Sequence, residues 1–149
     1  MPTPEERLQE LGVSLPAPAV PVAAYVPCVR TGSLVYVSGQ VPVLDGKPSH
    51  LGHLGDNVDL EDGRAASRTC AVNVLAALKA ELGELSRVRR VVKVTGFVAS
   101  TPDFTDHPKV INAASELFGD AGRHARAAIG VASLPLGVPV EVEAIVEVA

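Results

Sequence analysis

The 149-residue sequence has few cysteines, few aromatic side chains and no excess of basic residues. Two cysteines, Cys28 and Cys70, are too few for a disulfide-rich scaffold or a four-cysteine zinc site. Aromatic residues make up 3% of the chain and tryptophan is absent, which argues against broad aromatic platforms for stacking bases. Lys and Arg number 13 against 17 Asp and Glu, a formal net charge of -4, whereas surfaces for nucleic acids or anionic membranes need a basic excess.

Long apolar segments are also lacking. The first residues, 1–8, carry two acids and no apolar stretch of the kind that a secretory signal needs. No window approaches the roughly 18 apolar residues of a membrane span. We therefore expect a cytoplasmic protein with no membrane partner and no nucleic-acid partner.

Motifs for cofactors and metals are missing as well. The sequence contains no glycine-rich dinucleotide fingerprint and no phosphate-binding loop, because Pro48 follows Gly46-Lys47 where a hydroxyl residue is needed. His50 and His53 lie three residues apart, but no acid or cysteine stands near them at a convincing spacing. We expect solvent-exposed loop histidines there, and neither a metal nor a cofactor in the protein.

Apolar residues are abundant, at 47% of the chain, and valine is the commonest type, which favours β-sheet. Periodicity and turn residues predict the order β-β-(β)-α-β-α-β-β after a short N-terminal helix. The first half is expected to hold a helix capped at Thr3 and ended by Gly12, strands over 24–30 and 33–39, and a long loop over 41–62 that can add one short strand. A helix over about 59–82, ended by Gly83, and a strand over 88–98 follow. The last part is expected to hold a helix from Thr101-Pro102, recapped at Asp106 or His107 and closed by Gly119 and Gly122, and strands over 125–132 and 138–148.

This order predicts an α+β fold with a mixed sheet and two main helices on one face. Residues 1–149 form one domain, in which 1–22 are the N-terminal helix and a proline-rich connector. The second face of the sheet still carries valines that two helices cannot hide. We therefore expect another subunit to cover it.

One basic residue lies in an otherwise apolar segment. Arg126 lies near the start of an apolar strand, where a guanidinium is costly unless an anion pairs with it. A neighbouring carboxylate such as Glu141 or Glu143 is one candidate partner, and a substrate carboxylate is the other. The pattern alone favours neither.

Several short motifs occur in a recognisable order. They include Val37-Ser38-Gly39-Gln40-Val41-Pro42, Asn112 in the second main helix, Ala125-Arg126, Leu134-Pro135 and Val140-Glu141-Val142-Glu143-Ala144. In this order and spacing, from about Ala24 to the C-terminus, the sequence resembles the RidA (YjgF) family. The N-terminal helix and the 41–62 loop are typical of the family's longer branch.

The resemblance implies a chorismate-mutase-like two-layer fold and a homotrimer with clefts between its subunits. It implies hydrolysis of reactive enamines and imines, small 2-imino acids, to 2-keto acids and ammonia without a cofactor. In that site Arg126 would hold the substrate carboxylate and Glu141 would orient or activate water, with Glu143, two residues along the same face, as the other candidate. The residues expected to line the cleft are Tyr25, Ser38, Gly39 and Asn112.

Two other functions stay open on the sequence. In the first, a non-catalytic regulatory trimer binds a small carboxylate through Arg126. In the second, the protein is an endoribonuclease, an activity ascribed to some members of the family, although the low aromatic content argues against it.

Overall fold

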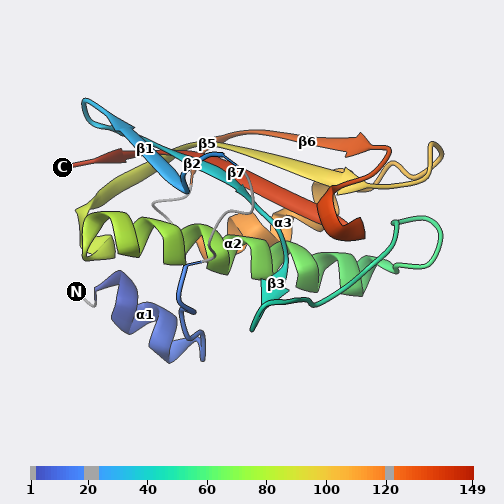
Figure 1. The fold of residues 1–149 in the computed structure, drawn as a ribbon, viewed down its shortest axis with the longest axis horizontal. Coiled ribbons are helices and arrows are strands. Elements are labelled where there is room, and N and C mark those ends of the chain that lie inside the picture. The colour runs from blue at the N-terminus through green and yellow to red at the C-terminus, as the bar shows by residue number, and fades with distance from the viewer. Residues whose placement is uncertain (1–2, 19–23, 120–122) are drawn as a thin grey trace.

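The computed structural model describes residues 3–18, 24–119 and 123–149 of the chain. A five-stranded mixed sheet forms one layer, and two long helices, α2 and α3, lie on one of its faces (Figure 1). The α+β fold class predicted from the sequence is therefore confirmed.

The sheet has the strand order β1-β2-β7-β5-β6, and of these pairs β5 and β6 run parallel while the others are antiparallel. Its strands are β1 (Cys28–Thr31), β2 (Leu34–Gln40), β5 (Val88–Ala99), β6 (Ala125–Val131) and β7 (Val140–Val148). A separate two-stranded hairpin, β3 (Val43–Leu44) and β4 (Lys47–Pro48), occupies part of the predicted 41–62 loop. Single 3-10 turns span Leu85–Arg87 and Pro135–Gly137.

Helix α2 (Leu60–Leu82) begins and ends where its sequence predicts. The carboxylate of Asp59 accepts a hydrogen bond from the backbone N–H of Asp62, and Gly83 ends the helix with a φ of 86°. Asn73, in the middle of this helix, donates to the carbonyls of Val41 and Val43 at 2.9 and 3.0 Å. These two bonds hold the β3–β4 hairpin against α2.

Helix α3 (His107–Leu117) is shorter than predicted. A helical start at Thr101-Pro102 is wrong: the N–H of Thr101 donates to the carbonyl of Leu54 at 3.0 Å, residues 102 and 103 form a turn, and the helix begins only at His107. Pro108 sits in the first turn, where it fits a helix but disfavours helical backbone just before it. The expected stop at Gly122 lies outside the described residues.

Helix α1 (Pro4–Glu10) packs on the helical side of the sheet (Figure 1). The hydroxyl of Thr3 accepts from the N–H of Glu6, whose carboxylate accepts from the N–H of Thr3, so the predicted capping box is present. Leu8 is buried in the core, and Glu5 accepts a hydrogen bond of 2.6 Å from the N–H of Leu85. None of the helices in the described ranges is long and apolar enough to cross a membrane.

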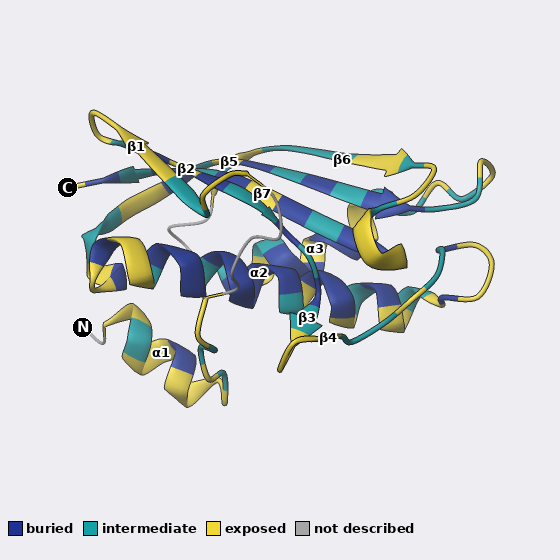
Figure 2. Cartoon of the chain, in the orientation of Figure 1, coloured by how far each residue is buried: buried dark blue, intermediate teal, exposed yellow. Residues whose placement is uncertain are grey.

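Burial alternates along the central strands. On β7, Val140, Val142, Ala144 and Val146 are buried against the helices, while the alternate residues 141, 143 and 145 face the other way. On that second face, the open face, Val29, Tyr36 and Ile129 are 44–55% exposed (Figure 2). The half-covered sheet is thus as predicted, and its cover by another subunit remains a prediction.

Candidate functional site

Arg126 is held from one side by helix α3. Its Nη1 donates to Oδ1 of Asn112 at 2.8 Å and to Oγ of Ser115 at 3.1 Å. Asn112 and Ser115 are three residues apart on α3 and so share one face of that helix. Ser115 is also 3.0 Å from Nε2 of His124. We call these four residues the guanidinium cluster.

The charge of Arg126 is not neutralised by its neighbours in the described part of the chain. The pairing with Glu141 or Glu143, one of the two alternatives that the sequence left open, is not formed, and no described carboxylate lies within 4.0 Å of the guanidinium. Both described hydrogen bonds use Nη1, which leaves the donors on Nη2 and Nε for another acceptor. The guanidinium is oriented by neutral groups and can still bind a carboxylate in a bidentate manner.

A second group forms around Glu141 in β7. Its side chain lies against Gly39 of β2, where an added Cβ would come within 2.9 Å of the carboxyl carbon. Ser38 and Gly39 fall at a break in the β2–β7 register, which lets the two backbones accommodate the carboxylate. Burial, and then the nearby charge of Glu143, raise the pKa of Glu141 above its ordinary value.

Ser38, which precedes Gly39, connects β2 to the segment before β1. Its Oγ donates to the carbonyl of Val26 at 2.6 Å, and its N–H donates to the carbonyl of Pro27 at 2.8 Å. The neighbouring Tyr25 is 52% exposed. We call Tyr25, Ser38, Gly39 and Glu141 the carboxylate cluster.

The two clusters do not meet within one chain. Arg126 pairs through Val94 with Ala144, whereas Glu141 lies three residues further along β7, so the two are offset by about 10 Å along the strands and about 10 Å across them. The register also places them on opposite faces, since Arg126 reaches α3 and Glu141 points to the open face. A site that uses both residues needs two copies of the chain.

Glu143 has different surroundings from Glu141. It lines a hollow of about 390 Å³ on the open face, together with Tyr36, Ser38, Lys93 and Ile145. Glu141 does not line that hollow. The raised pKa and the fit against Gly39 therefore single out Glu141, while Glu143 shares its hollow with a cation.

Two members of the guanidinium cluster, Ser115 and His124, were not among the residues predicted for the site. The spacing of Ser115 from Asn112 on one helix is a signal that could have indicated it. The histidines at 50 and 53 are half-buried, and each has its own partner: Nδ1 of His50 is 3.0 Å from Oγ of Ser49, and Nε2 of His53 is 2.8 Å from the carbonyl of Ala132. In the described residues, no three His, Cys, Asp or Glu side chains are grouped to hold a metal ion.

Comparison with known proteins gives a consistent result. The family model described as "Endoribonuclease L-PSP" matches residues 16–148. The chain is 48% identical to Protein TCP17 of Trypanosoma cruzi, over 94% of this chain and 91% of that protein. It is 36% identical to a 2-iminobutanoate/2-iminopropanoate deaminase of Salmonella typhimurium, over 87% and 90% of the two chains.

A solved structure has the same fold as this chain. The crystal structure of Atu1372, a protein of unknown function from Agrobacterium tumefaciens, superposes with a TM-score of 0.92 at 50% identity. That match covers 98% of this chain and 92% of the other, so it includes the region of α1.

Proposed function

The chain belongs to the RidA family, whose model carries the description Endoribonuclease L-PSP, and on this basis we propose that it hydrolyses small 2-imino acids to 2-keto acids and ammonia. The site we propose lies between two chains of a homotrimer. One chain supplies the guanidinium cluster and its neighbour supplies the carboxylate cluster. A relative named as a 2-iminobutanoate/2-iminopropanoate deaminase supports this substrate class.

Hydrolysis of an imine requires few catalytic side chains. An imine carbon is already electrophilic, so the protein has to orient it, place a water and assist proton transfer. In the proposed reaction Arg126 holds the carboxylate, and Glu141 takes a proton from the water as its oxygen bonds to the imine carbon. The same carboxyl returns that proton to the nitrogen, which gives a carbinolamine. It then takes the proton of the new hydroxyl and delivers it to the nitrogen as the C–N bond breaks, so that ammonia leaves and the C=O bond of the keto acid forms.

The raised pKa of Glu141 suits this role. A carboxyl that accepts and returns a proton works best when its pKa approaches the working pH. Burial beside Gly39 and the charge of Glu143 both move the pKa in that direction. Ser38 hydrogen-bonds to Val26, the residue after the exposed Tyr25, and in the proposed site Tyr25 and Ser38 would line the cleft.

The observation that carries the proposal is the state of Arg126. A partly buried guanidinium that hydrogen-bonds only to the neutral Asn112 and Ser115 in the described chain has donors left for an anion. We expect Arg126→Ala to lower kcat/KM at least about 100-fold when an amino-acid oxidase supplies the imine, since a bidentate pair is lost. Asn112→Ala, which frees the guanidinium without removing it, should raise KM more than it lowers kcat.

Mixing two inactive variants tests the inter-chain geometry. Arg126→Ala and Glu141→Gln chains are unfolded together and refolded at equal amounts. Random assembly leaves about one quarter of the sites with an intact Arg126 and an intact Glu141, so about a quarter of wild-type activity should return. No return of activity, or Arg126→Ala chains as active as wild type, would refute the proposal.

A second function is favoured by one feature of the same geometry. The guanidinium cluster is complete within a single chain, so it can bind a small carboxylate whether or not Glu141 of another chain acts on it. Calorimetry with 2-keto acids separates the two. Binding that depends on Arg126 without any turnover of imines would identify a ligand-binding protein in place of the enzyme.

The family description also names an endoribonuclease activity. Cleavage of RNA by the wild-type chain that is lost in Arg126→Ala would assign it to the proposed cleft. Cleavage that persists in that variant would assign it elsewhere on the protein.

A further inference from the structure

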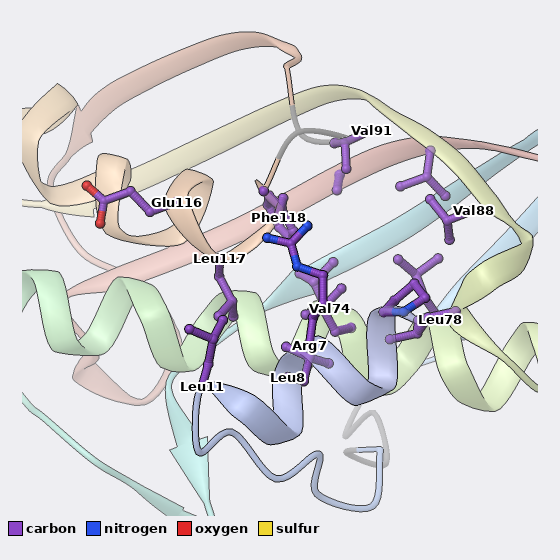
Figure 3. A pocket seen from close by; sticks show the side chains of 16 residues that line it. Arg7, Leu8, Leu11, Val74, Leu78, Val88, Val91, Glu116, Leu117 and Phe118 are labelled. Atoms are coloured by element: carbon purple, nitrogen blue, oxygen red, sulfur yellow. The ribbon is translucent and has the colours of Figure 1, made fainter. Parts of the chain in front are cut away.

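A second cavity lies on the helical side of the sheet, and it touches the guanidinium cluster through the ring of Phe118, which packs edge-on against His124. It has a volume of about 220 Å³ and is enclosed by α1, α2, the end of α3 and the strands β5 and β7 (Figure 3). Its lining is almost entirely aliphatic, and it includes Leu8, Leu11, Val74, Leu78, Val91 and Leu117. A hollow of this composition stays poorly hydrated and favours an apolar occupant.

Helix α1 forms the outer wall of this cavity. Leu8 is 6% exposed, whereas Leu11, one turn further along, is 57% exposed at the edge. Glu5 fixes the start of the helix through the N–H of Leu85 and the ammonium of Lys79, at 2.6 and 3.5 Å. The wall is thus anchored on one side and open at Leu11.

Among the residues that the structure describes, the one cation that lines the cavity is Arg7. Figure 3 shows its guanidinium extended toward Phe118, at the end of α3. It lies beside Gly119, where an added Cβ would be 3.5 Å from Nη2 of Arg7. The negative end of the α3 dipole favours a cation at this position.

The only acid on the described lining is already paired elsewhere. Glu116 receives both of its described hydrogen bonds from Nη2 of Arg64, at 3.2 and 3.3 Å. Within the described ranges Arg7 has no ion pair and no side-chain hydrogen bond. The cavity therefore combines an aliphatic interior with a positive charge at its rim that pairs with no described residue.

We propose that this cavity binds a medium-chain aliphatic carboxylate, with the chain among the leucines and valines and the carboxylate on Arg7. The site is separate from the proposed imine-hydrolysing cleft, because none of the residues of the two clusters lines the cavity. An uncharged apolar molecule would contact the aliphatic interior but not Arg7. A short anion such as acetate would contact Arg7 but leave the interior empty.

Isothermal titration calorimetry with sodium octanoate tests the proposal. We expect one molecule bound per chain, with affinity that rises about fourfold for each methylene from hexanoate to octanoate. Arg7→Gln should weaken octanoate binding at least about tenfold and leave the binding of octanol unchanged. Arg68→Gln, at an exposed arginine of α2 that does not line the cavity, is the matched control and should bind as wild type.

A second pair of variants tests the interior without disturbing the core. Leu11→Trp places a large ring at the open edge of the cavity and should reduce octanoate binding, whereas Leu51→Trp, at another leucine with similar exposure, should not. Arg126→Ala should bind octanoate as wild type does. Absence of octanoate binding, equal binding by Arg7→Gln and wild type, or loss of binding only in Arg126→Ala would each overturn the proposal.

Discussion

The surroundings of two charged side chains, Arg126 and Glu141, suit them to different chemical roles. Arg126 is oriented by an amide and a hydroxyl, which fix its direction without cancelling its charge. Glu141 is pressed against a glycine and close to a second carboxylate, both of which disfavour its charged form. The first arrangement suits binding an anion, and the second suits exchanging a proton.

The raised pKa of Glu141 predicts a gain in stability on its neutralisation. A carboxyl whose pKa is higher in the folded protein than in the unfolded chain destabilises the fold as pH rises through that interval. We expect Glu141→Gln to raise the Tm by a few degrees at pH 7–8 and by nothing below about pH 4, where both states carry the proton. Differential scanning calorimetry across this range measures it, with Glu84→Gln, at an exposed acid that has no described ion pair, as the control. An equal gain at all pH values would contradict the assignment.

At the scale of elements, the contacts that matter most are those that attach short segments to the two long layers. Asn73 ties the β3–β4 hairpin to α2 through two carbonyls. Ser38 ties the segment before β1 to β2. Glu5 ties α1 to the turn before β5, and so fixes one wall of the aliphatic cavity.

The attachment of α1 should depend on pH. Although burial acts to raise the pKa of Glu5, the N–H of Leu85 and the nearby ammonium of Lys79 lower it overall. A lowered carboxyl pKa gives stability that is present near neutrality and is lost as pH falls through the folded value. We expect Glu5→Gln to cost about 0.5–1 kcal/mol at pH 7 and less as the solution is acidified, because the charge-assisted bond is lost.

Hydrogen exchange of the α1 amides at pH 7 and pH 4 locates this effect. Faster exchange confined to α1 in Glu5→Gln at pH 7 is the expected result. Glu10→Gln, at an exposed acid of the same helix, serves as the control. Exchange that increases equally throughout α2 would show a global effect and contradict the local one.

For the whole molecule, the most consequential property is the open face of the sheet. Helices α2 and α3 protect one face, and the other exposes Val29, Tyr36 and Ile129 (Figure 2). Apolar side chains on an uncovered sheet face support the subunit contact that we propose there. The separation of Arg126 from Glu141 independently calls for a second chain at the proposed site.

We expect light scattering to give three times the chain mass of 15.4 kDa. Ile129→Glu should shift the protein toward the monomer and lower imine hydrolysis with it, because a charge on the open face opposes burial. Leu44→Glu, at a leucine of the same 44% exposure on β3, should leave the mass unchanged. A monomeric wild-type protein would contradict both the trimer and the inter-chain site.

Local patterns in the sequence determined the elements and the layers. Thr3, Asp59 and Gly83 mark helix ends because caps depend on residues only a few positions away, and the alternation of valines with glutamates along β7 depends on adjacent residues. In place of the helix predicted from Thr101, the chain pairs there with the distant Leu54, turns, and begins its helix only at His107. Only the fold could supply that partner.

The same division holds for the candidate site. Sequence resemblance named Arg126, Glu141, Tyr25, Ser38, Gly39 and Asn112, since short motifs can be matched to a family without knowledge of the fold. Tertiary structure decided that Arg126 and Glu141 point to opposite faces, that Ser115 joins Arg126, and that α1 closes an aliphatic cavity beside Arg7. Strand register and packing set these relations through contacts between residues far apart in the chain, and such contacts leave no local pattern in a single sequence.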